Sequence, residues 1–196
     1  MQAELAALVG SRICHDLVSP IGAISNGVEL LAMTQNSAGE EMALIKQSVE
    51  SAAARLRFFR IAYGLAANDQ SIRGKEVQSI LSAVAETGRV QYDWQVEGDL
   101  PRDITRCAFL LIQALETALP LGGTIVVSGN ADAVTMRANG RKTAFDAELW
   151  GPLSDGEVPA MTTASQVQFA LLAHQLTASQ RTVTVTDTGQ DILAQF

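Results

Sequence analysis

The sequence predicts a protein of two parts, in which an antiparallel hairpin of two long helices precedes a small α+β domain. Apolar residues recur every three or four positions over residues 3–34 and again over 42–63, and a short polar run separates the two stretches. From about residue 72 onward, helix-like and strand-like patterns alternate. We therefore assign residues 1–67 to the hairpin and residues 72–196 to the second domain. The fold class of the whole chain is predicted to be α plus α/β sandwich.

The composition is that of an ordinary globular protein with an acidic surface. Of the 196 residues, 47% are hydrophobic and 18% are charged, and the net charge is −7. This balance argues against a nucleic-acid surface, which needs clustered Lys and Arg. No apolar run reaches the about 20 residues of a membrane span, and the N-terminus lacks the pattern of a signal peptide. We expect a cytoplasmic protein that binds neither nucleic acid nor membrane.

The first helix is predicted from Ala3 to about Thr34 and has one apolar stripe. At 100° per residue this stripe is formed by Leu17, Ile21, Ile24, Val28 and Leu31. His15 lies opposite the stripe, so its imidazole is expected in solvent rather than in the core. Four small or polar residues lie on the same face of the helix as His15, and their short side chains would let a partner's helix approach: Ser11, Ser19, Gly22 and Asn26.

The neighbours of His15 add chemistry. Asp16 can accept a hydrogen bond from one ring nitrogen, which fixes the tautomer and leaves the other nitrogen as a nucleophile. Pro20 cannot donate a backbone hydrogen bond, so we expect the helix to bend just beyond the histidine. Cys14 lies on the flank of the helix and is predicted to be a small buried residue. The two cysteines and two distant histidines offer neither a zinc site nor a disulfide framework.

The second helix carries a heptad stripe that a single hairpin cannot cover. Its members are Met42, Ile45, Val49, Ala52, Leu56, Phe59 and Tyr63. Two copies can bury both stripes in a four-helix bundle, so we predict a homodimer; the alternative is that the C-terminal half covers the hairpin within one chain. With the turn near residues 36–37, Arg55, Arg57 and Arg60 are expected level with His15. There they either meet an anionic group that approaches His15 or remain solvated and paired with local acids.

The second domain is predicted to pack helices on a small, mostly antiparallel sheet. A polar linker over residues 67–71 leads into it. Helices are expected at 75–87, 104–119 and 165–178, with a weak helix at 144–149 followed by a loop at 151–159. Strands are expected at 90–96, 124–128, 134–138 and 182–186. Asp187-Thr188-Gly189 is predicted to form a turn between terminal strands, and His174 to be a core or surface residue.

The segment His15-Asp16-Leu17-Val18-Ser19-Pro20-Ile21 resembles the phosphoacceptor box of two-component histidine kinases. The resemblance implies that His15 becomes phosphorylated, that Asp16 is its acid/base partner, and that Ser19 is the polar residue one turn further on.

The order of elements after the hairpin resembles a reduced histidine-kinase ATPase domain, the Bergerat fold. The nucleotide machinery is missing, since residues 106–119 contain Glu116 as their only acid and no Asn, and residues 151–156 contain no Gly-x-Gly. A phosphoacceptor hairpin followed by a degenerate ATPase-like domain is similar to the ChpT-type histidine phosphotransferases. This resemblance spans the chain and is strongest over residues 11–31.

The resemblance implies a phosphorelay function. A phosphoryl group would pass from a receiver aspartate of a hybrid kinase to His15 and on to a response regulator, with Mg²⁺ supplied by the receiver and no cofactor bound by this chain. Residues placed at the docking face are Ser11, Arg12, Val18, Gly22, Asn26, Arg57 and Arg60. The alternatives are a dimeric adaptor without enzymatic activity and, less favoured, an ATP-dependent histidine kinase.

Overall fold

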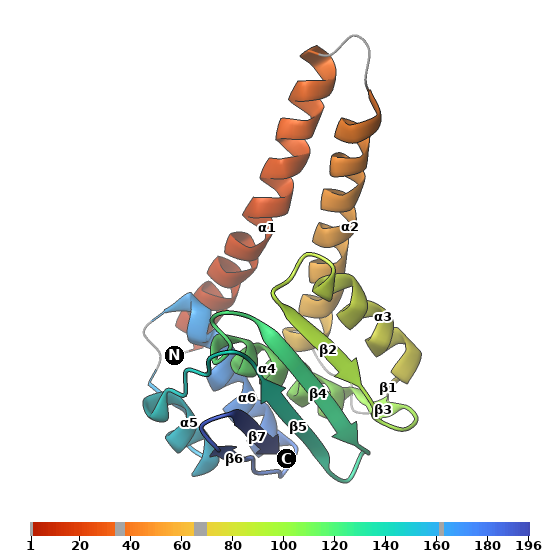
Figure 1. Cartoon of the computed structure of the whole chain (residues 1–196). Coiled ribbons are helices and arrows are strands. Elements are labelled where there is room, and N and C mark those ends of the chain that lie inside the picture. Colours follow the sequence, from red (N-terminus) through yellow and green to blue (C-terminus); the bar gives the residue numbers. More distant parts are fainter. Residues whose placement is uncertain (1, 34–37, 65–69, 161–162) are drawn as a thin grey trace.

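The structure, a computed structural model, describes residues 2–33, 38–64, 70–160 and 163–196. Helices α1 (Gln2–Met33) and α2 (Ala38–Ala62) form the predicted hairpin, which projects from the rest of the molecule (Figure 1). Pro20 lies inside α1. The residues predicted for the turn and the linker lie in large part outside the described ranges.

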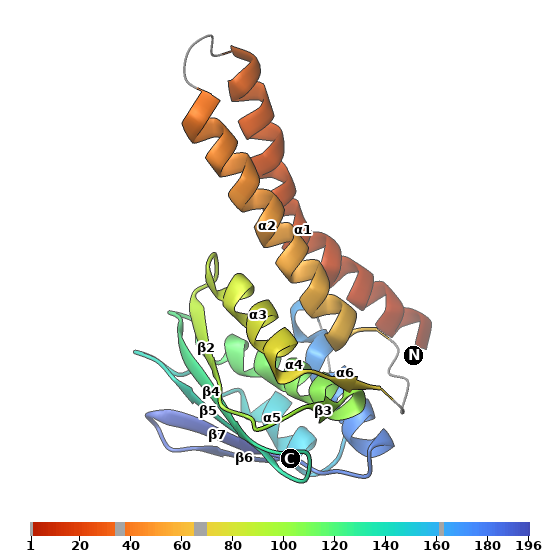
Figure 2. The same ribbon diagram turned by 90° about the vertical axis from the view of Figure 1, so that its right-hand side faces the viewer.

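The second part is the predicted small, mostly antiparallel sheet with helices on one face. The sheet has the order β2-β4-β5-β7-β6, in which β2 and β4 are parallel and the other pairs are antiparallel. Figure 2 shows α3, α4 and α6 on the same face of this sheet. The strands are β2 (Val90–Trp94), β4 (Gly123–Gly129), β5 (Val134–Asn139), β6 (Thr184–Asp187) and β7 (Asp191–Gln195). The helices are α3 (Gly74–Ala85), α4 (Arg102–Thr117), α5 (Ala147–Ser154) and α6 (Val167–Ala178), the last preceded by the 3-10 helix η1 (Ala164–Gln166).

Two smaller features complete this part of the molecule. Strands β1 (Ser71–Ile72) and β3 (Leu100–Pro101) pair in an antiparallel fashion, which the sequence analysis did not anticipate. The tight turn between β6 and β7 is the one predicted at Asp187-Thr188-Gly189. Gly189 has φ +80°, a conformation in which a residue with a Cβ is strained.

One hydrophobic core joins the base of the hairpin to the sheet domain. Phe58 and Phe59 of α2 are buried in the same cluster as the apolar residues of α4. The rings of Phe58 and Phe109 lie 4.6 Å apart between centroids. The C-terminal half therefore covers the base of the hairpin, whereas Ile21 and Val49, further along it, are each about half exposed.

The loop predicted at 151–159 is wrong in its first part. Helix α5 begins at Ala147 and continues through Gly151 and Pro152 to Ser154. The Asp146 side chain caps its start by accepting a hydrogen bond from the Glu148 backbone N–H at 3.0 Å. Trp150 is 1% exposed and packs edge to face on Phe169. Burial of this ring outweighs the low helix propensity of Gly and Pro.

Candidate functional site

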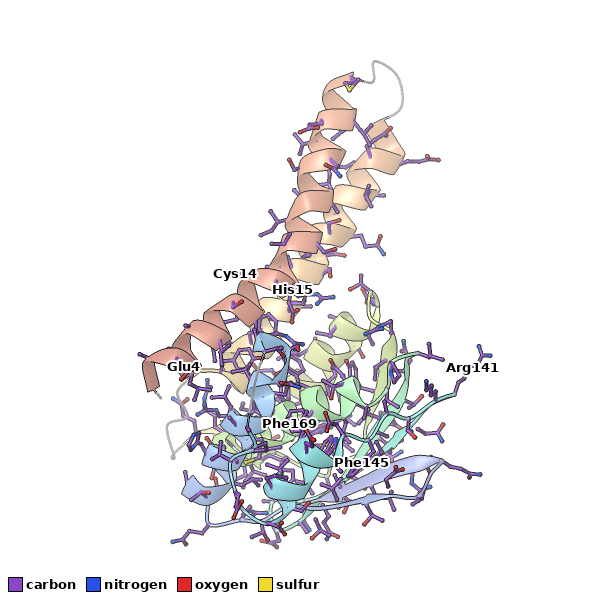
Figure 3. All side chains as sticks on the ribbon, turned by 90° about the vertical axis from the view of Figure 1, so that its left-hand side faces the viewer. Glu4, Cys14, His15, Arg141, Phe145 and Phe169 are labelled. Atoms are coloured by element: carbon purple, nitrogen blue, oxygen red, sulfur yellow. The ribbon has the colours of Figure 1, made fainter. Side chains whose placement is uncertain are left out.

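The site is built on α1, at the point where the hairpin meets the rest of the molecule. Figure 3 shows His15 there. The His15 side chain is 86% exposed, which confirms the predicted orientation away from the apolar stripe. Ser11, Ser19, Gly22 and Asn26 are exposed as well. A histidine on a face of small residues is open to a partner protein.

Asp16 holds the imidazole through one carboxylate oxygen. The Nδ1 of His15 lies 3.1 Å from Oδ1 of Asp16, and because a carboxylate only accepts, the ring donates its Nδ1 proton. The Asp16 side chain is only 13% exposed, so it is far more enclosed than the histidine it contacts. In the neutral imidazole, this arrangement leaves Nε2 of His15 without a proton and available as a nucleophile.

The second carboxylate oxygen of Asp16 is bound by Arg12, one turn earlier on α1. Arg12 Nε donates to Asp16 Oδ2 at 2.8 Å, and Nη1 donates to the carbonyl oxygen of Ser165 in η1 at 3.1 Å. Although burial opposes the charged form, the Asp16 carboxylate raises the pKa of the Arg12 guanidinium. Arg12 was predicted to lie at the docking face; in the structure its side chain turns inward, and 16% of it is exposed.

A cavity of about 260 Å³ lies behind Asp16, between the hairpin and the sheet domain. Tyr92 of β2 donates to Glu116 Oε1 in this cavity at 2.6 Å. Burial raises the pKa of the Glu116 carboxyl, against the effects of the Tyr92 hydrogen bond and of Arg12. Arg55 of α2 lines the same cavity, and its Nε is buried with no hydrogen-bond partner among the described residues. Arg55 was predicted to lie level with His15, whereas the contribution of Tyr92 and Glu116 was missed because these residues lie far from the His15 segment in the sequence.

The remaining predicted site residues lie on the surface. Val18 is 67% exposed, and Arg57 and Arg60 are exposed too. Arg60 lies 3.8 Å from the carboxylate of Glu76 on α3. Cys14 is exposed, so its prediction as a buried residue is wrong. Its position on the flank of α1 faces solvent because no other element covers that side of the helix in the described part of the chain.

The described residues contain no group of three or more His, Cys, Asp or Glu side chains arranged to hold a metal ion. None of the helices in these ranges is long and apolar enough to cross a bilayer.

Comparison with known proteins identifies the family. The family model described as the histidine phosphotransferase C-terminal domain matches residues 74–191. Because the match covers more than half of the chain, the protein belongs to the histidine phosphotransferase family.

Particular relatives agree with this assignment. Protein phosphotransferase ChpT of Brucella abortus (strain 2308) is 37% identical over 127 residues, which make up 63% of this chain and 60% of that protein. The matched region therefore spans less than two thirds of that curated relative.

A solved structure of a bacterial phosphotransferase superposes with a TM-score of 0.82 at 29% identity, covering 100% of this chain and 96% of that one. The histidine kinase AdeS of Acinetobacter baumannii reaches a TM-score of 0.46 at 13% identity, over 92% and 95% of the two chains, and this likeness is too distant to support an argument.

Proposed function

We propose that this protein is a histidine phosphotransferase of a phosphorelay, which passes phosphoryl groups between receiver-domain aspartates through His15. One observation carries the proposal: His15 is exposed, and Asp16 engages its Nδ1 so that Nε2 is free. Membership of the histidine phosphotransferase family and the named phosphotransferase relative support it.

In the proposed reaction, the Nε2 lone pair of His15 attacks the phosphorus of a receiver's aspartyl phosphate. An N–P bond forms while the bond from phosphorus to the aspartate oxygen breaks, and the aspartate leaves as a carboxylate. The Asp16 carboxylate stabilises the positive charge that develops on the imidazole through its hydrogen bond to Nδ1–H. Transfer to a second receiver reverses these steps. The receiver holds the Mg²⁺ and the acidic pocket, so this chain supplies nucleophile and docking surface.

The docking face extends along α1 on both sides of His15. Ser11, Ser19, Gly22 and Asn26 are small enough to admit a helix of the receiver, and Val18 adds apolar contact area. Arg57 and Arg60 are exposed cations that can meet the acidic receiver surface. In this proposal the segment 72–196 is a degenerate ATPase-like Bergerat domain that no longer binds nucleotide.

We also propose that the hairpin, residues 1–67, dimerises into a four-helix bundle. Met42, Val49 and Leu56 on α2 are spaced by seven residues and are 53%, 47% and 52% exposed. Ile21 and Val28 on α1 have the same spacing and are 56% and 54% exposed. Exposed heptad positions on both helices fit burial by a second copy.

The transfer proposal is tested with a receiver domain that carries labelled phosphate. Label should move to the wild-type protein and not to the His15→Gln variant, and it should not appear when the protein is mixed with labelled ATP alone. Label from ATP would instead show a kinase. No label under either condition, with partner kinases still bound, would show an adaptor.

The dimer proposal is tested by measuring the mass in solution by light scattering. Val49→Asp places a charge on the exposed apolar face and should give the mass of one chain. Ala43→Asp is the control, because Ala43 is also exposed but lies about 120° around the helix. A wild-type mass of one chain would refute the dimer.

A further inference from the structure

We propose that Arg12 is a positioning residue that fixes Asp16 against His15, and that the Ser165 carbonyl of the C-terminal domain holds Arg12 in place. The inference rests on the proposed transfer function and assigns a role within it to the segment before α6.

The first step concerns the two oxygens of the Asp16 carboxylate, which bind different residues. Oδ1 faces His15 at 3.1 Å and Oδ2 faces Arg12 at 2.8 Å, so each oxygen has a different partner. A carboxylate next to an exposed histidine on a helix is otherwise free to turn toward water. The bond to Arg12 therefore fixes the direction from which Oδ1 approaches the imidazole.

The second step is the rigidity of the guanidinium. Its N–H groups lie in one plane with fixed directions, so the Nε bond to Asp16 and the Nη1 bond to Ser165 set each other's orientation. Only 16% of the Arg12 side chain is exposed, which limits competition from water. A lysine has a single ammonium and cannot reproduce this fork.

The third step is the anchoring of Ser165 itself. Its hydroxyl lies 2.7 Å from that of Thr163, and the following helix is packed into the core by Val167 and Phe169, both 0% exposed. The carbonyl that receives Arg12 thus belongs to the sheet domain and is fixed relative to its core. Through Arg12, the orientation of Asp16 depends on the C-terminal domain remaining packed against α1.

Besides Asp16, the Glu116 carboxylate and Tyr63, the residue directly after α2, also raise the pKa of the Arg12 guanidinium. If Arg12 served only to neutralise Glu116, adding Glu116→Gln to Arg12→Gln would restore transfer. The bonds of Arg12 to Asp16 and Ser165 do not involve Glu116, so the double variant should remain as slow as Arg12→Gln alone.

The experiment compares Arg12→Gln and Arg12→Lys with the wild type. Arg141→Gln is the matched control, since Arg141 is an exposed arginine far from His15 (Figure 3). Single-turnover transfer at saturating phosphorylated receiver, the Kd for the receiver, and the His15 tautomer from imidazole ¹⁵N shifts are measured for each protein. Thermal unfolding checks that each variant is folded.

We expect Arg12→Gln to slow transfer at saturation by up to about tenfold, because Arg12 acts through Asp16 and the loss of the Asp16 hydrogen bond to His15 sets the limit. The Kd for the receiver should not change, and the neutral imidazole should lose its preference for the Nδ1-protonated tautomer. Arg12→Lys keeps the charge but not the two N–H donors in fixed directions, so its rate should lie between those of the wild type and Arg12→Gln.

A weaker Kd with an unchanged saturated rate would overturn the proposal and make Arg12 a docking residue. A wild-type rate and tautomer in Arg12→Gln would overturn it as well. If the wild type itself transfers no phosphate, the transfer proposal fails, but the tautomer measurement still decides the role of Arg12. If Arg12→Gln does not fold, the same readouts on Arg12→Lys decide it.

Discussion

Replacing Asp16 by asparagine separates the shape of this side chain from its chemistry. The carboxylate accepts two hydrogen bonds, from Arg12 Nε at 2.8 Å and from His15 Nδ1 at 3.1 Å. The amide of Asn has only one oxygen, and the permanently charged Arg12 should take it. The NH₂ group then faces His15 Nδ1, which must become an acceptor, so the proton moves to Nε2 and blocks the nucleophile.

The size of the effect follows from the bond that is lost. A hydrogen bond to a charged group contributes about 1.5–3 kcal/mol. Because His15 is 86% exposed, water competes for the imidazole and the lower end of that range applies. At about 1.4 kcal/mol per factor of ten, Asp16→Asn should slow phosphoryl transfer to His15 by about tenfold.

The assay is single-turnover transfer from a phosphorylated receiver, with the imidazole tautomer measured in parallel by ¹⁵N NMR. The far-ultraviolet circular dichroism of the variant should match the wild type, since the replacement preserves shape. An Asp16→Asn variant with the wild-type rate would refute the reasoning. A slower rate with an unchanged tautomer would show that Asp16 acts by its charge and not by orienting the ring.

Three further predictions concern the core and the thiols. The pKa of the Glu116 carboxyl is raised, so the folded state resists its ionisation. The free energy of unfolding of the wild type, relative to that of Glu116→Gln, should therefore fall as the pH rises above the ordinary pKa of 4.5. Urea titrations would contradict this if the difference between the two proteins were the same at pH 4 and pH 7. Phe169→Ala removes a fully buried ring and should lower the free energy of unfolding by about 3–5 kcal/mol in urea denaturation. A loss under about 1 kcal/mol would contradict this and show that neighbouring side chains fill the cavity. A disulfide reagent should modify Cys14 in the native protein and Cys107 only after unfolding, because Cys107 is buried and burial raises the pKa of its thiol to about 12. Two reactive thiols in the native wild type, or one in the native Cys14→Ser control, would count against this assignment.

Much of the fold could be predicted because it depends on local periodicity. The 3.6-residue repeat of α1 and α2 was sufficient to define the hairpin and to place His15 on its solvent face. The main helices and most strands of the second part were also predicted. The course of α5 through Gly151 and Pro152 was not, because the packing of Trp150 on Phe169 brings together residues from separate elements.

The candidate site divides in the same way. The pattern around His15 predicted the histidine, its acidic neighbour and the small residues of the docking face. The contact of Arg12 with Ser165 joins residues 153 positions apart, and no local pattern signals it. The same holds for Tyr92 and Glu116, whose hydrogen bond requires β2 and α4 to be packed first.

The sequence by itself determined which residue is the proposed nucleophile and on which face of the helix it lies, because helix geometry relates neighbouring positions at fixed angles. Only the tertiary structure decided how that nucleophile is held. The orientation of Asp16 depends on Arg12, and Arg12 depends on a backbone carbonyl of the C-terminal domain. Every residue has a backbone carbonyl, so the side chain of Ser165 does not reveal that its carbonyl binds Arg12. That contact follows from how the chain packs.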